Sequence, residues 1–178
     1  MRPRAWLALK IVSVSLALTL SGCGFKLEGA GSLPPEMAAT YLNSAQPSSV
    51  FYARLRDALR LRGLTIVSDP QQAGATLSIS NDDTGQRVLS VSARNIPREY
   101  EIFYTVTFSL QAGTDSLIEP ESLIVTRSYT YDETQVLGKS QEERVLRRAL
   151  ADDLARQVVR RIEAAGTRVG VPSVVSRE

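Results

Sequence analysis

Residues 100–110 read YEIFYTVTFSL, and this stretch decides the fold. Along it, large apolar or aromatic side chains alternate with mostly polar ones. The large set is Tyr100, Ile102, Tyr104, Val106, Phe108 and Leu110. A period of two places successive side chains on opposite faces of a β-strand. The stretch therefore predicts a strand that has one face in a hydrophobic core.

A second strand is predicted before it, over residues 75–91. Ala75, Leu77 and Ile79 alternate with small polar residues. The alternation falters in the polar run NDDTGQ at residues 81–86 and resumes at Val88. Such a break fits either a hairpin or one long strand with a bulge, and we favour the long strand.

Two further strands complete the predicted sheet. Residues 37–42 form a short apolar-rich stretch after two prolines, and residues 123–131 alternate again. Arg127 interrupts the more aromatic side of this last strand. A lone arginine on such a face is usually paired or near a sheet edge, and contact with a partner is the alternative for Arg127.

Two helices are predicted around these strands. Residues 51–59 carry apolar side chains at three- or four-residue spacing, with Ser48 or Ser49 available as cap and Gly63 placed to end the helix. A longer helix is expected to begin at Ser140, because SQEE at residues 140–143 matches a capping box. Its apolar stripe ends before Gly166.

The order of these elements predicts an α+β domain over residues 37–165. We expect a two-layer sandwich of two helices packed on a mixed, mainly antiparallel sheet of about four strands. Residues 166–178 have no hydrophobic period and are expected to form a flexible tail. Such a sandwich leaves one face of its sheet, and its sheet edges, available to a partner.

The N-terminus indicates export and lipid attachment. Residues 1–22 combine a positive start with a short apolar run, which predicts a signal peptide. The apolar run is too short for a permanent membrane span. It ends in LSGC at residues 20–23, so Cys23 is the expected lipid attachment site and membrane anchor. The Gly- and Pro-rich residues 23–36 then form a lipidated tether.

Composition excludes several chemistries. The 178 residues include no histidine and one cysteine, so imidazole bases, imidazole zinc ligands and internal disulfides are absent. We therefore expect no enzyme, no catalytic residue, no metal and no cofactor. The composition does not exclude acid–base catalysis by carboxylates, lysine or tyrosine. Removing residues 1–22 lowers the formal charge from +2 to −1, which argues against a nucleic-acid partner.

Several short motifs resemble those of the LptE family. They are LSGC followed by GFKL at residues 20–27, LPPEM at 33–37, LRLRG at 59–63 and REY at 98–100. The resemblance extends from Cys23 to about Ile162, and the order of elements agrees with that predicted above. Individual motifs are short, and their order is the stronger signal.

This resemblance implies a non-catalytic partner of an LptD-type outer-membrane β-barrel. Such a lipoprotein would sit as a plug in the barrel lumen or on its periplasmic side, assist its assembly and bind lipopolysaccharide during delivery to the outer leaflet. Basic loop residues contact lipopolysaccharide in the family, and Arg94 and Lys139 fall close to those positions. Guanidinium and ammonium groups bind phosphate and carboxylate by charge-assisted hydrogen bonds.

Two alternatives remain open at this point. A tether joined to a small sandwich also suits a lipid-anchored auxiliary or scaffold subunit of another envelope transporter, because fold does not fix function. An enzyme would draw on the acidic residues near predicted strand ends, which are Glu99, Glu101, Asp132 and Glu133.

Overall fold

The computed structural model describes residues 33–130 and 136–169 of the chain. The predicted signal peptide, Cys23 and most of the predicted tether lie outside the described residues. The helices and strands are β1 (Ala39–Ser44), α2 (Val50–Leu61), β2 (Thr65–Val67), β3 (Ala75–Val91), β4 (Pro97–Ala112), β5 (Asp115–Thr130) and α3 (Val136–Val169). Short 3-10 helices, η1 (Pro35–Ala38) and η2 (Pro70–Gln72), precede β1 and β3.

The strands form one mixed sheet in the order β2-β1-β3-β4-β5. β1 runs parallel to both β2 and β3, whereas β3, β4 and β5 are antiparallel neighbours. The α+β prediction is therefore confirmed, with one more strand than expected. β2 spans only Thr65–Val67, and three residues are too few to display a period.

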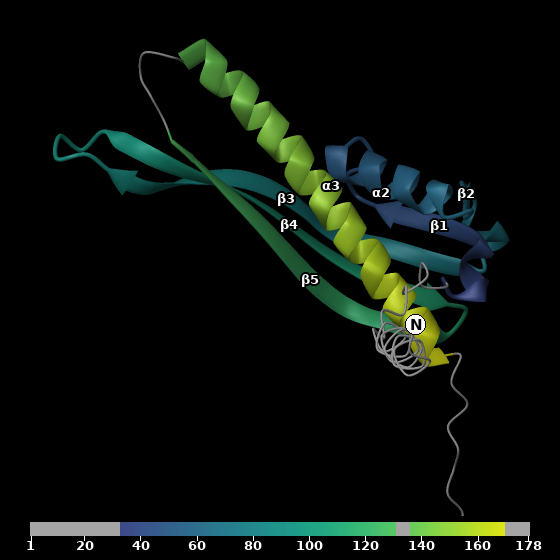
Figure 1. Cartoon of the computed structure of the whole chain (residues 1–178). Coiled ribbons are helices and arrows are strands. Elements are labelled where there is room, and N and C mark those ends of the chain that lie inside the picture. The colour runs from purple at the N-terminus through teal and green to yellow at the C-terminus, as the bar shows by residue number, and fades with distance from the viewer. Residues whose placement is uncertain (1–32, 131–135, 170–178) are drawn as a thin grey trace, which may run out of the picture. The chain divides into compact units, whose positions relative to one another are not determined.

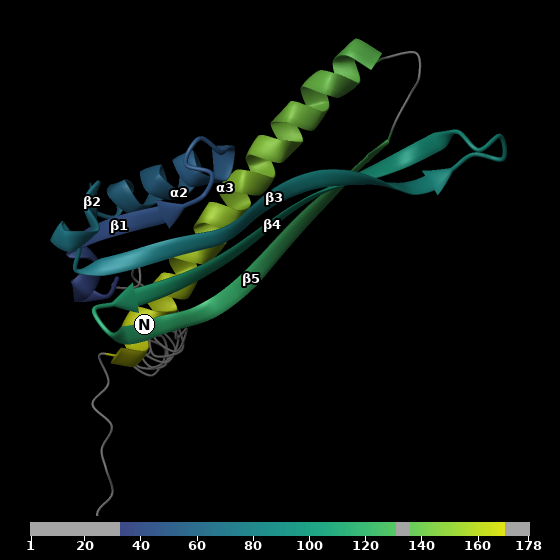
Figure 2. The same ribbon diagram turned by 180° about the vertical axis from the view of Figure 1, so that it is seen from behind.

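The helices pack on the same face of the sheet, and Figures 1 and 2 show α2 beside α3 from opposite directions. The alternation predicted along β4 is confirmed, because every second residue from Ile102 to Leu110 is buried. The side chains that meet it from the helices are Phe51, Leu55 and Leu59 of α2 with Leu150, Leu154, Val158 and Ile162 of α3. Burial of each such side chain contributes about 1.5–3 kcal/mol, so this layer holds the sandwich together.

Both ends of α2 follow the sequence prediction. Ser49 is the N-cap, and its Oγ accepts a 2.9 Å hydrogen bond from the backbone N–H of Tyr52. Gly63 follows the helix with φ +86°, a left-handed conformation that suits glycine because it has no Cβ. Sequence-local signals therefore determine where this helix begins and ends.

The predicted start of α3 is wrong. The helix begins at Val136, so Ser140 lies inside it and does not cap it. A capping box would direct Glu143 back toward Ser140. Its carboxylate instead accepts hydrogen bonds from Arg147, one turn further along.

The predicted end of α3 is also early. The helix continues past Gly166 to Val169, and Ala165 is still buried against the domain. A glycine in a helix costs only about 1 kcal/mol relative to alanine, which packing of the preceding turns offsets. The remaining residues of the predicted tail, 170–178, lie outside the described residues.

The distal part of the β3–β4 hairpin extends beyond the helix-covered core. We call residues 84–102 the arm. It meets the core at the buried Ile102, and Figures 1 and 2 show it projecting from one end of the sheet. β3 has no buried residue after Asp82, and β4 has none before Ile102. The prediction of one long strand with a bulge is confirmed, since β3 pairs with β4 throughout and its register shifts between Ile79 and Asn81.

Candidate functional site

Arg94 lies in the turn at the tip of the arm and is exposed to solvent. The turn is closed by hydrogen bonds between Ser92 and Ile96, at 2.7 Å, and from the N–H of Asn95 to the Ser92 carbonyl, at 2.9 Å. Asn95 has a φ of 63°, a conformation that asparagine tolerates better than most residues. The predicted loop environment of Arg94 is therefore confirmed.

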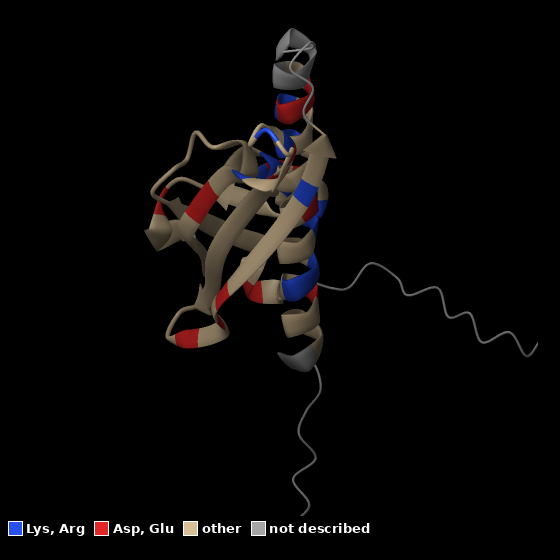
Figure 3. Cartoon of the chain, turned by 90° about the vertical axis from the view of Figure 1, so that its left-hand side faces the viewer, with Lys and Arg blue, Asp and Glu red and all other residues tan. Residues whose placement is uncertain are grey.

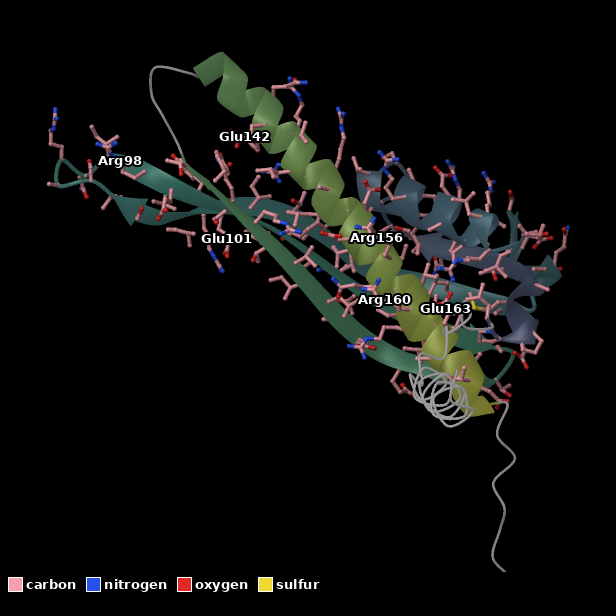
Figure 4. All side chains as sticks on the ribbon, in the orientation of Figure 1. Arg98, Glu101, Glu142, Arg156, Arg160 and Glu163 are labelled. Carbon is pink, nitrogen blue, oxygen red and sulfur yellow. The ribbon has the colours of Figure 1, made fainter. Side chains whose placement is uncertain are left out.

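The predicted loop environment of Lys139 is wrong, because residue 139 lies within the first turns of α3. In Figures 1 and 2 this end of α3 and the tip of the arm project from the same end of the domain. Figure 4 labels Arg98 on the arm and Glu142 on α3 in this region. The fold thus brings the segments that carry Arg94 and Lys139 to one end, and ligand contact by either residue stays a prediction.

The lipid anchor predicted at Cys23 lies outside the described residues and also stays a prediction. Within residues 33–130 and 136–169, no helix has the length and apolarity needed to cross a membrane.

The sheet face opposite the helices is rich in hydroxyl side chains. Its members include Ser78, Thr105, Thr107, Ser109, Ser122 and Thr126. Thr107 Oγ1 and Ser122 Oγ are 2.8 Å apart across β4 and β5. Figure 3 shows the strands uncharged over most of their length, whereas α3 carries many charged residues. No helix of the described part covers this face, so it offers a broad polar contact surface.

Phe103 places an aromatic ring on that polar face. Gly85 pairs with Phe103 across β3 and β4. A Cβ added at Gly85 would lie 2.5 Å from the Phe103 ring, so the ring lies over the glycine. Because an aromatic ring beside a strand glycine shields the backbone there, this pair stabilises the base of the arm.

A buried polar network joins the inner face of the sheet to α2. Asp82 and Tyr104 are 8% and 3% exposed. The Tyr104 hydroxyl donates a 2.8 Å hydrogen bond to Asp82 Oδ1, and the Ser49 hydroxyl donates to Oδ2. The Asp82 carboxylate therefore lies beside the N-terminus of α2, where the helix dipole favours a negative charge.

Burial raises the pKa of the Tyr104 phenol above its usual range, and the hydrogen bond to Asp82 raises it further. Tyr104 consequently remains a proton donor to the carboxylate. The network borders an open pocket of about 400 Å³ that Asp83, Thr84 and Arg147 also line.

Sequence reasoning missed Asp82 and Arg147. Asp82 lies in the polar run at residues 81–86, which has turn-like composition. The only signal for its burial is its spacing from Ile79. Residues three positions apart normally face opposite sides of a strand, but the bulge between Ile79 and Asn81 places Asp82 on the same face as Ile79. Arg147 has no local sequence signal for contact with the sheet, yet its Nη1 donates a 2.8 Å hydrogen bond to Thr84 Oγ1 on β3.

The prediction for Arg127 is confirmed on both counts. It lies on β5, an edge strand of the sheet, and its Nη2 is 3.3 Å from Asp153 Oδ2 on α3. The pair fixes the edge strand to the helix that crosses it. Because both side chains are partly exposed, it contributes at most about 1 kcal/mol.

Of the acidic residues considered for catalysis, the two that the structure describes each bind a side chain of β3. Glu99 accepts a 2.9 Å hydrogen bond from Ser90, and Glu101 pairs with Arg87. Asp132 and Glu133 lie outside the described residues. Among the residues that the structure describes, no group of three or more acidic or Cys side chains could hold a metal ion.

Solved structures with this fold include lipoproteins. A rare lipoprotein B from Shewanella oneidensis matches with a TM-score of 0.65 and 22% identity, covering 75% of this chain and 99% of that chain. An uncharacterized lipoprotein B from Nitrosomonas europaea matches with a TM-score of 0.67 and 24% identity, covering 83% and 97% respectively. The fold is thus that of a class of small lipoprotein domains.

Sequence comparison identifies the family. The family model LptE, described as lipopolysaccharide-assembly, matches residues 37–162. The LPS-assembly lipoprotein LptE of Yersinia enterocolitica is 31% identical over 147 residues, which cover 82% of this chain and 70% of that protein. The chain belongs to the LptE family. The resemblance inferred from its motifs is therefore confirmed.

Proposed function

We propose that this protein is a lipid-anchored, non-catalytic subunit of lipopolysaccharide assembly at the outer membrane. In this proposal it associates with an LptD-type β-barrel, within the lumen or on its periplasmic side, and binds lipopolysaccharide for delivery to the outer leaflet. The observation that carries the proposal is the family match across residues 37–162, which spans nearly the whole sandwich.

Three features of the chain support it. LSGC at residues 20–23 provides a lipidation motif, with Cys23 as the attachment site. The uncovered hydroxyl-rich sheet face suits contact with a polar barrel lumen, because lumen-facing residues of such barrels are polar. The exposed Arg94 at the tip of the arm is available for the anionic groups of lipopolysaccharide.

The association is tested by affinity purification of the tagged full-length chain from membranes in gentle detergent. A large outer-membrane β-barrel should be recovered in stoichiometric amount, and depletion of the chain should reduce surface lipopolysaccharide. Recovery of the chain alone would contradict the proposal. Recovery of a different envelope transporter would favour the scaffold alternative.

The anchor is tested by mass spectrometry of the mature N-terminus. Cys23 should be the first residue and carry acyl chains, and Cys23→Ser should abolish both acylation and membrane retention. Without acyl chains the variant loses the buried methylene groups that hold it on a bilayer, so its release into the soluble fraction is expected. Membrane retention of an unacylated variant would refute lipid anchoring.

A further inference from the structure

Arg147 is the centre of a hydrogen-bond chain that joins α3 to the arm. Its Nε and Nη2 donate to Glu143 Oε1 at 2.9 and 2.8 Å, and its Nη1 donates to Thr84 Oγ1 at 2.8 Å. Thr84 Oγ1 in turn donates a 2.9 Å hydrogen bond to the Phe103 carbonyl. The guanidinium is thus held by Glu143 of its own helix and donates to Thr84, the first residue of the arm.

This link lies where hydrophobic packing gives little support. Among the described side chains of α3, none before Leu150 is fully buried, although Leu146 packs partly against the core. The arm residues of β3 are likewise unburied. Because local stability follows the number of buried apolar contacts, individual polar ties add substantially to the few apolar contacts that fix the relative position of these segments.

A second set of contacts joins β5 to the same part of the arm. Tyr129 of β5 stacks on Tyr100 with a ring-centroid separation of 5.7 Å, and its hydroxyl donates a 3.3 Å hydrogen bond to Gln86. Burial, followed by the nearby Glu143 carboxylate, raises the pKa of Tyr129.

We infer that Arg147 is a positioning residue: through Thr84 it sets the arm against the N-terminal part of α3, and so sets the spacing of the Arg94 and Lys139 segments. This inference rests on the proposed function, in which those two segments receive an anionic ligand. A partly exposed ion pair contributes little to global stability, so the effect of Arg147 is local.

The experiment uses the full-length lipoprotein in detergent micelles. Hydrogen exchange of residues 84–102 and lipopolysaccharide affinity are measured for Arg147→Gln, Arg147→Lys and Thr84→Val. Thr84→Val removes the acceptor on the arm but keeps the guanidinium and the Glu143 carboxylate. Arg148→Gln is the matched control, because Arg148 is its exposed neighbour on the same helix.

Arg147→Gln and Thr84→Val should both speed exchange in the arm, by roughly tenfold, because a lost charge-assisted hydrogen bond shifts an opening equilibrium by about that factor. Both should also weaken lipopolysaccharide binding severalfold. Arg147→Lys keeps a donor, so it should retain part of the wild-type exchange protection and part of the wild-type affinity for lipopolysaccharide. Arg148→Gln should change neither measurement, and the melting temperature should stay nearly constant throughout.

Unchanged exchange in Arg147→Gln would overturn the inference. Faster exchange with unchanged affinity would overturn the positioning role. Weaker binding in Arg147→Gln together with normal binding in Thr84→Val would also overturn it, since the guanidinium would then contact the ligand directly. A wild-type chain that binds no lipopolysaccharide would instead refute the proposed function, while the exchange data would still decide whether Arg147 holds the arm.

Discussion

The Tyr104 hydroxyl donates a 2.8 Å hydrogen bond to the Asp82 carboxylate beneath the N-terminus of α2. The two residues lie diagonally across the β3–β4 pair, since Asp82 pairs with Val106 and Tyr104 pairs with Thr84. A buried carboxylate is costly unless its oxygens are bonded, and here each oxygen accepts from a hydroxyl. The pair therefore connects sheet and helix with a polar contact inside an apolar core.

Ser49→Ala should destabilise the domain by about 1–2 kcal/mol, because it removes both the cap of α2 and one donor to Asp82. The loss is measured as a lower free energy of unfolding in urea. Ser48→Ala is the matched control, since Ser48 is exposed and adjacent. Equal losses in the two variants would contradict the assignment of Ser49 as the cap.

The stability of the domain should fall at alkaline pH. Burial raises the pKa of Tyr104 in the folded state, whereas in the unfolded chain tyrosine titrates near 10. The contribution of Tyr104 is therefore complete below pH 10 and is lost progressively as the pH rises further, by up to about 1.4 kcal/mol per pH unit.

Tyr104→Phe should remove this part of the pH dependence, although Tyr129, whose pKa is also raised by burial, retains one of the same sign. The measurement is the free energy of unfolding in urea at a series of pH values from 8 to about 11. A slope that is the same in Tyr104→Phe and in the wild type would refute the assignment.

Gly74→Ala should destabilise the domain by about 1–3 kcal/mol or more, as expected for overpacking. A Cβ at Gly74 would lie 2.3 Å from the backbone carbonyl oxygen of Glu36, which cannot move without distorting η1. Thermal unfolding measures the change. The neighbouring Gln71 is exposed, so Gln71→Ala should be close to neutral, and a neutral Gly74→Ala would show that η1 can shift freely.

Replacing Arg94 and Lys139 together with Asp should weaken lipopolysaccharide binding and leave co-purification of the barrel unchanged. The reversed charges repel phosphate groups, and neither residue belongs to the strands of the hydroxyl-rich sheet face. Arg60→Asp is the control, because Arg60 is an exposed arginine on α2. Unaltered binding in the double variant would remove both residues as ligand contacts.

Elements with a clear period or a local signal were predictable from the sequence. β4 follows from its alternation, and α2 follows from Ser49 and Gly63, because each signal acts within a few residues of its effect. α3 was assigned correctly, but its start was placed at Ser140. A capping box is a local signal, and the helix continues on its N-terminal side through residues 136–139.

The features that the sequence did not predict depend on contacts between residues far apart in the chain. β2 forms only because Thr65–Val67 meets β1, and the burial of Asp82 requires a bulge whose position no local pattern specifies. The link from Arg147 to Thr84 joins residues 63 positions apart. The sequence predicts a loop at both candidate ligand residues. This prediction is correct for Arg94 and wrong for Lys139.

The bulge at Ser80 has a consequence for changes in chain length. It resets the phase of β3, so that Ile79 and Asp82 face the same side although three positions separate them. Deletion of Ser80 would restore a regular ladder and leave every later cross-strand partner unchanged. Deletion of one residue from 83–87 would instead turn the side chains beyond it onto the opposite face. Deletion of Ser80 would thus preserve the faces of the later side chains, whereas deletion of a residue a few positions further along the same strand would invert them.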